Sequence, residues 1–211
     1  MPDGTPAALP DIVRELYTRF GENRFVRQPT KDDVPTLWVA PEDRDAVLQF
    51  LKSSLPRPFT MLLDLQAVDE RMRRHREGLP PADFTVFYHL LSIERCGPQD
   101  SGQVRIKVPL QGEFPSIKSI AELYANANWY ERETWDLFGI RFEGHPHLER
   151  ILLPRYWQGH PGRKEYSARA TEFDPYLLTA LRQDQEQAAL EFKPEEVDTM
   201  VTTYPIDFLP S

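Results

Sequence analysis

The segment from Asn126 to Tyr166 reads NANWYERETWDLFGIRFEGHPHLERILLPRYWQGHPGRKEY, and it is the part of the sequence that says most about the fold and function of the chain. It holds eight aromatic residues and two Gly-His-Pro triplets, at 144–146 and 159–161, without one cysteine. Aromatic rings mixed with Arg, Glu and His provide a large area for burial together with polar groups that need partners. This composition is typical of residues that dock against another protein surface.

Two motifs within the segment resemble the C subunit of proton-pumping NADH:quinone oxidoreductase, respiratory complex I. The first runs from Glu131 to Ile140, ERETWDLFGI, and continues through Phe142 to the first Gly-His-Pro. The second is the later Gly-His-Pro with the following RKEY. The resemblance covers residues 20–194 and is closest to the bacterial form that is fused ahead of the D subunit. Gly162 and Ser167 depart from it, because the family usually has leucine and proline there.

The resemblance implies a cofactor-free subunit of the peripheral arm, packed beside the D and B subunits at the cytoplasmic face of the bacterial inner membrane. NADH, FMN, iron–sulfur clusters and quinone would be bound elsewhere in the complex, and this chain would brace the module that passes electrons to quinone. We expect it to contribute no catalytic and no metal-binding residue, and we expect Leu137 and its neighbours to be core. Interface or interface-supporting roles are expected for Trp129, Tyr130, Arg132, Trp135, Asp136, Phe138, His145, His160, Arg163 and Tyr166.

Two other functions stay open on the sequence. One is a homologous accessory domain of a membrane-bound nickel–iron hydrogenase complex, and the other is a free-standing hydrolase that uses glutamate and histidine. The hydrolase is disfavoured because Gly-His-Pro places each histidine in a turn, where no tetrahedral ligand set is presented. Glu131 and Glu133 would diverge on a helix and could not flank one substrate bond. Arg132 and Asp136, four residues apart, could form an ion pair along the same helix.

Composition restricts the class of protein. The chain has 211 residues, 40% of them hydrophobic, which is enough for one substantial core. Its net charge of -8 disfavours nucleic acid as a partner, although Arg71–Arg76 is a basic run that fits a solvated loop or docking on an acidic or phosphate-bearing neighbour. No apolar run approaches the roughly 20 residues of a membrane span, and residues 1–10 do not resemble a signal peptide. The single cysteine, Cys96, cannot form an internal disulfide or hold an iron–sulfur cluster alone, and it fits a reducing, cytosolic setting.

Hydrophobic periodicity predicts an α+β fold, a mixed or mostly antiparallel sheet flanked by helices. Helices are expected over residues 11–20, ending at Gly21, and from Pro41 to about residue 53. Ser119 with Glu122 predicts a short helix that ends near Ala125, and Asn128 with Glu131 predicts a longer one closed by Gly139. Strands are expected over residues 25–28, 34–40, 59–68, 84–93 and 104–110, the first two as a hairpin and the last two as antiparallel neighbours.

The character of the chain changes after Tyr166. We expect one α+β domain over residues 1–166, which includes the signature segment 126–166. Asp174 and Pro175 then open a helix that is rich in Gln, Glu and Ala and runs to Glu191. The last residues lack the apolar content for a core of their own. We therefore expect residues 167–211 to form a docking helix and an extended tail, a C-terminal arm that lies on a partner.

Overall fold

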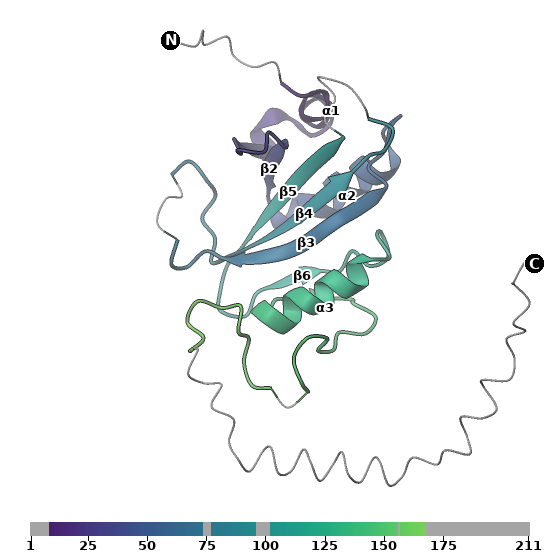
Figure 1. Cartoon of the computed structure of the whole chain (residues 1–211). Helices are drawn as coiled ribbons and strands as arrows, with labels where there is room; N and C mark the ends of the chain where they lie inside the picture. The colour runs from purple at the N-terminus through teal and green to yellow at the C-terminus, as the bar shows by residue number, and fades with distance from the viewer. Residues whose placement is uncertain (1–8, 74–76, 96–101, 156, 168–211) are drawn as a thin grey trace, which may run out of the picture. The chain divides into compact units, whose positions relative to one another are not determined.

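The computed structural model describes residues 9–73, 77–95, 102–155 and 157–167 (Figure 1). The chain divides into two compact units, Met1–Tyr166 and Ser167–Ser211. The helix and tail expected in the second unit lie outside the described residues and stay a prediction. The elements of the first unit are α1 (Asp11–Phe20), a 3-10 turn (Glu22–Arg24), β1 (Phe25–Gln28), β2 (Thr36–Val39), α2 (Pro41–Ser53), β3 (Met61–Asp69), β4 (Phe84–Leu91), β5 (Gln103–Leu110), β6 (Ser116–Lys118), α3 (Ala127–Phe138) and β7 (Arg141–Glu143).

The main sheet has five strands in the order β1-β2-β5-β4-β3. The β1–β2, β5–β4 and β4–β3 pairs are antiparallel and only β2–β5 is parallel, so the predicted mixed, mostly antiparallel α+β fold is confirmed. The predicted hairpin of residues 25–28 and 34–40 is also confirmed. Along β5 buried Val104, Ile106 and Val108 alternate with half-buried residues, as expected for a sheet that packs on one face only.

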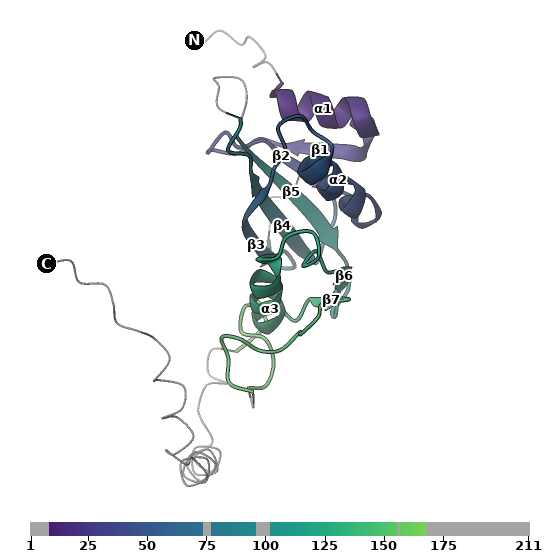
Figure 2. The same ribbon diagram turned by 90° about the vertical axis from the view of Figure 1, so that its right-hand side faces the viewer.

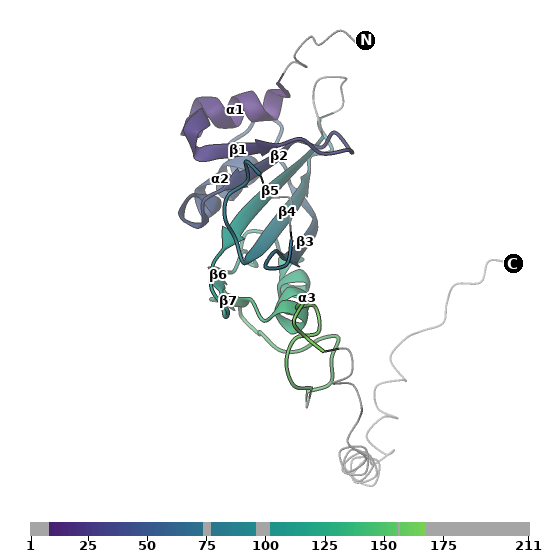
Figure 3. The same cartoon turned by 90° about the vertical axis from the view of Figure 1, so that its left-hand side faces the viewer.

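Helices α1 and α2 lie on the same face of this sheet (Figures 2 and 3). α1 buries Ile12, Val13 and Leu16 and ends at Gly21, whose φ of 91° suits a glycine. α2 begins at Pro41. Proline suits the first position of a helix, because an N–H there would have no partner within the helix. Both helices match their predicted ranges.

Helix α3 covers the edge strand β3 with hydrogen bonds as well as packing. Three side chains at or within it donate to main-chain oxygens of β3: Asn126 to Leu62 and Tyr130 to Leu63, both at 2.8 Å, and Thr134 to Leu65 at 3.5 Å. The β3–β4 register shifts between Leu62 and Asp64, so Leu63 lies at an irregular point of the strand. An edge strand left open would offer its unpaired groups to other chains. α3 closes this edge.

The short helix predicted from Ser119 to Ala125 is wrong, because these residues form turns. A capping box needs the Glu122 carboxylate to accept the Ser119 amide, but this amide donates to the Glu143 carbonyl at 2.8 Å, and the Ser119 hydroxyl donates to the Glu131 carboxylate at 2.6 Å. α3 itself is confirmed, with Gly139 in the left-handed conformation at its end. It begins at Ala127, however, and the predicted cap formed by Asn128 and Glu131 is wrong. The three-residue strands β6 and β7, which pair in parallel, were too short to be predicted.

Candidate interaction site around helix α3

Asp136 is a fully buried carboxylate that holds the loop after β7 against α3. Its Oδ2 accepts the amides of Ile151, Leu152 and Leu153 at 3.1, 2.9 and 2.9 Å, and its Oδ1 accepts Arg150 Nη1 at 2.5 Å. Burial raises the pKa of Asp136, but these hydrogen bonds outweigh it and hold the pKa below its ordinary value. The carboxylate therefore stays charged and fixes three consecutive residues of the loop.

Arg150 and His160 continue this arrangement, which we call the Asp136 cluster, formed by Asp136, residues 150–153 and His160. Arg150 Nη2 donates to the carbonyls of Trp157 and Gly159 at 2.9 and 3.1 Å, and its guanidinium lies over the Trp135 ring. His160 Nδ1 lies 2.9 Å from the Asp136 carbonyl, which can only accept, so this nitrogen carries the proton. Burial lowers the pKa of His160. The second Gly-His-Pro is thus bound to the same residue as the first part of the loop.

The end of α3 explains the glycine at 139. Gly139 has φ of 71°, and a Cβ there would lie 2.5 Å from His160 Cδ2 and 2.9 Å from Arg163 Nη2. Arg163 is 8% exposed, donates its Nε to the Phe138 carbonyl at 2.7 Å and stacks over Phe84. Only a residue without a side chain lets His160 and Arg163 approach the helix end this closely.

A second buried carboxylate, Asp69, fixes the end of the segment. It accepts Arg71 Nε and Nη2 at 3.0 and 2.6 Å and the amide of Lys164 at 2.9 Å. Burial raises its pKa, but the hydrogen bonds from Arg71 and Lys164 prevail and lower the pKa of Asp69 to about 2. Arg71 also pairs with Glu165 and lies over the Phe84 ring at 4.6 Å. Residues 163–165 are therefore attached to the end of β3.

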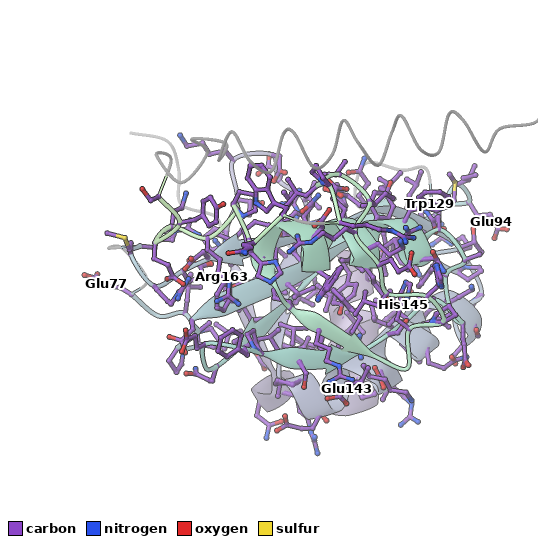
Figure 4. The ribbon with its side chains drawn as sticks, turned by 90° about the horizontal axis from the view of Figure 1, so that it is seen from below. Glu77, Glu94, Trp129, Glu143, His145 and Arg163 are labelled. Carbon is purple, nitrogen blue, oxygen red and sulfur yellow. The ribbon has the colours of Figure 1, made fainter. Side chains whose placement is uncertain are left out.

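The other end of α3 is held by Glu131 and His145. The buried Glu131 carboxylate accepts Ser119 Oγ and the amide of Ile120 at 2.6 and 2.7 Å, although burial raises its pKa. His145 lies 4.0 Å from this carboxylate, and its Nε2 is 3.1 Å from the carbonyl of Asn128. Burial lowers the pKa of His145. Figure 4 shows His145 and Trp129 toward one end of the unit and Arg163 toward the other.

The structure places the ten predicted interface residues around α3, but most of them face inward. Only Trp129, at 61% exposed, is largely open to solvent. Asp136 and Arg163 are buried, and the remaining seven are half-buried: Tyr130, Arg132, Trp135, Phe138, His145, His160 and Tyr166. Whether any of the ten contacts a partner stays a prediction.

Two sequence interpretations of α3 are wrong. The ion pair of Arg132 with Asp136 does not form, because Asp136 binds Arg150 and Arg132 donates to the carbonyls of Glu149 and Arg150. Of Leu137 and its neighbours, which were expected in the core, Trp135 and Phe138 do pack against it, but Leu137 is only half-buried and does not, while Glu131 and Thr134 are fully buried. α3 buries polar groups because its inner side meets main-chain oxygens and loop amides, which need hydrogen-bonding partners.

Sequence reasoning missed Arg150, Asp69 and Glu131 as organising residues. Arg150 and Asp136 are fourteen residues apart with an irregular loop between them, so no periodic pattern links them. Asp69 and Lys164 are separated by ninety-five positions. The sequence signal was weak, because Asp69 is one of two acidic residues in the mostly apolar strand β3.

The sequence of the chain matches a family of known proteins. A family described as "Respiratory-chain NADH dehydrogenase, 30 Kd subunit" matches residues 37–172, more than half of the chain. The chain belongs to this family. It is 58% identical over 186 residues to the NADH-quinone oxidoreductase C/D subunit of Azotobacter vinelandii and 56% identical over 188 residues to that of Psychrobacter cryohalolentis. These alignments cover 88% and 89% of this chain but only 30% and 31% of the relatives, so the chain spans about a third of their length.

Two solved structures share the fold of this 30 kDa family member. One is "Nqo5 of the trypsin-resistant fragment (1-134)", with TM-score 0.50, 23% identity, and coverage of 65% of this chain and 96% of that one. The other comes from the membrane-bound sulfane sulfur reductase, an archaeal respiratory membrane complex, with TM-score 0.55, 20% identity, and coverage of 75% and 85%.

The family match includes every residue of the Asp136 cluster as well as Asp69 and Arg163. In the part of this family member that the structure describes, no three His, Cys, Asp or Glu side chains gather as metal ligands. Among the same residues, no helix has both the length and the apolar content to cross a bilayer.

Proposed function

We propose that this chain is a cofactor-free peripheral-arm subunit of a proton-translocating NADH:quinone oxidoreductase. It would brace the module in which electrons from NADH, passed through FMN and iron–sulfur clusters on other subunits, reach quinone. The observation that carries the proposal is the identity of 55–58% over nearly nine-tenths of this chain to several C/D subunits of NADH-quinone oxidoreductases.

The chemistry of the site supports a bracing role. Asp136 and Asp69 accept amides and arginines, Glu131 accepts a hydroxyl and an amide, and the two Gly-His-Pro histidines face backbone carbonyls. Groups used in this way hold an irregular loop in one shape. Electron transfer and quinone reduction depend on fixed distances between centres, and a rigid component can set such distances without binding a substrate.

The proposed partners are chiefly the D and B subunits, at the cytoplasmic face of the bacterial inner membrane. Trp129 would contact a partner directly, since it is the most exposed of the ten predicted interface residues. Tyr130, Arg132, Trp135, Asp136, Phe138, His145, His160, Arg163 and Tyr166 would support the interface by keeping α3 and its loop in place. The arm of residues 167–211 would dock on the same assembly.

The two alternatives are less well supported. No particular observation supports the hypothesis of a hydrogenase accessory domain, since the relatives at 55–58% identity are named as subunits of NADH-quinone oxidoreductases. A Glu/His hydrolase would need a histidine free to exchange protons. His145 and His160 are instead held against backbone carbonyls, in a neutral form that burial favours.

Affinity purification of the tagged full chain from detergent-solubilised membranes of its native host tests the proposal. The expected result is recovery of the other NADH:quinone oxidoreductase subunits together with NADH:quinone activity, while the chain expressed alone oxidises no NADH. Recovery of the chain by itself, or within a nickel-containing complex that evolves hydrogen, would contradict it.

A further inference from the structure

The outward side of α3 carries a row of three residues, of which the rest of the described chain leaves one largely exposed and two half-buried. Trp129, Glu133 and Leu137 follow one another at four-residue spacing, so they lie along one side of the helix. Trp129 is 61% exposed, whereas Glu133 and Leu137 are half-buried. The buried residues of the helix are Ala127, Glu131 and Thr134 on its inner side and Asp136, which residues 150–153 cover. The row is the surface that remains when the inner side has packed.

Two neighbouring elements extend this row. On one side Asn126 and Tyr130 hold the first part of β3, where Met61 is 42% exposed. On the other side Asp136 holds the amide of Leu152, whose side chain is 58% exposed. Exposed apolar side chains on elements that contact one another are more often part of an interaction surface than isolated ones are. We define the Trp129 patch as Met61, Trp129, Glu133, Leu137 and Leu152.

The charge at the centre of the Trp129 patch is uncompensated. Within the described part of the chain, Glu133 has no hydrogen bond and no ion pair. The adjacent Arg132 is already engaged: it donates to the carbonyls of Glu149 and Arg150, and its guanidinium lies 5.3 Å from the Trp129 ring centroid. The patch therefore presents apolar side chains around one carboxylate that is free to bind a cation.

We propose that the Trp129 patch docks a protein segment in which apolar side chains surround a lysine or arginine that pairs with Glu133. The inference rests on the proposed function, since it names a surface through which the chain would join its assembly. A tryptophan in the middle of a docked surface is a typical anchor of binding energy. A carboxylate that loses its water there needs a cationic partner, because an unpaired buried charge is costly.

The same charge argues against two other occupants. An anionic lipid surface would meet Glu133 with charge of the same sign. A second copy that used this patch symmetrically would bring two Glu133 side chains together. Both arrangements oppose like charges in a surface that is losing water, so a basic protein segment fits better.

Photocrosslinking in the native host tests this inference. The full chain carries p-benzoylphenylalanine in place of Leu152, at the rim of the patch, and crosslinked peptides are sequenced by mass spectrometry. The expected crosslink lies in another protein, within about one helical turn of a lysine or arginine flanked by apolar residues. Adding Trp129→Ala or Glu133→Arg should reduce the crosslink yield at least tenfold. Met72→Ala, which removes an apolar side chain that is 73% exposed and follows the other end of β3, should leave it unchanged.

Reversal of charge provides the sharper arm of the experiment. Replacing the crosslinked basic residue of the partner with glutamate should restore the yield lost in Glu133→Arg. The Trp129→Ala and Glu133→Arg variants of this chain should each unfold at the wild-type temperature. Unchanged crosslinking in Glu133→Arg would overturn the inference, as would a crosslink to lipid, to a second copy or to residues 168–211. If the wild-type chain co-purifies with oxidoreductase subunits in these cases, the proposed function stands alone. If it does not co-purify, the proposed function itself fails.

Discussion

Asp136 Oδ1 and Arg150 Nη1 lie 2.5 Å apart, and this buried pair joins the last turn of α3 to the loop that carries the second Gly-His-Pro. The Asp136 side chain is fully buried and that of Arg150 is 13% exposed. Arg150 also holds two carbonyls further along the loop, so one pair fixes both parts of the segment. The pair therefore fixes the path of residues 150–159 against the end of α3.

Asp136→Asn should lower the free energy of unfolding by about 3 kcal/mol, because it leaves Arg150 without its carboxylate in a buried position. Urea unfolding of the chain measures the change. Glu133→Asn, on the outward side of the same helix, is the control and should change stability by no more than about 0.5 kcal/mol. Equal effects of the two variants would show that the buried pair contributes nothing particular.

Gly139→Ala should destabilise the chain more than Gly144→Ala does. Both glycines have similar positive φ, 71° and 77°, but a Cβ at 139 would meet His160 at 2.5 Å, whereas nothing lies within 4 Å of a Cβ at 144. The backbone cost alone is on the order of 1 kcal/mol at either position. The excess measured for Gly139→Ala by thermal unfolding reports the displaced His160. Losses of the same size would show that this histidine moves away freely.

The lowered pKa of Asp69 predicts that the folded chain loses stability in acid. Because its folded pKa of about 2 lies below the ordinary 3.8, its contribution is fully present above pH 4 and is lost as pH falls toward 2. In Asp69→Asn, the dependence of the unfolding temperature on pH should be shallower within this window. A profile with the wild-type slope would assign the acid sensitivity to other carboxylates.

Trp135→Ala should cost about 2–3 kcal/mol of stability, because the ring packs against the core and stacks with His160 and Arg150. Trp129→Ala should cost less than about 0.5 kcal/mol, since the ring is mostly in solvent. Denaturant unfolding of the two variants compares them directly. Sequence alone assigned both tryptophans to the interface, and the reverse order of losses would restore that interpretation for Trp135.

The sequence predicted most of the fold because its elements are local. α1, α2 and the β4–β5 pair follow from apolar periodicity, Pro41 and Gly21, which act within a few residues. The helix expected from Ser119 failed because the Ser119 amide, which Glu122 would accept in a capping box, donates instead to the carbonyl of Glu143, twenty-four positions away. A local capping pattern carries no information about so distant a partner.

The family and the α+β architecture could be predicted from the sequence itself, since the motifs in residues 131–166 and the periodicity of the strands are properties of the linear chain. The tertiary structure alone decided which members of the signature face inward. Asp136, Glu131 and Asp69 are bound to groups that only the folded chain brings near them, and hydrogen bonds to loop amides leave no periodic trace. Trp129 is exposed and Glu133 is half-buried because other side chains of α3 make its contacts to β3.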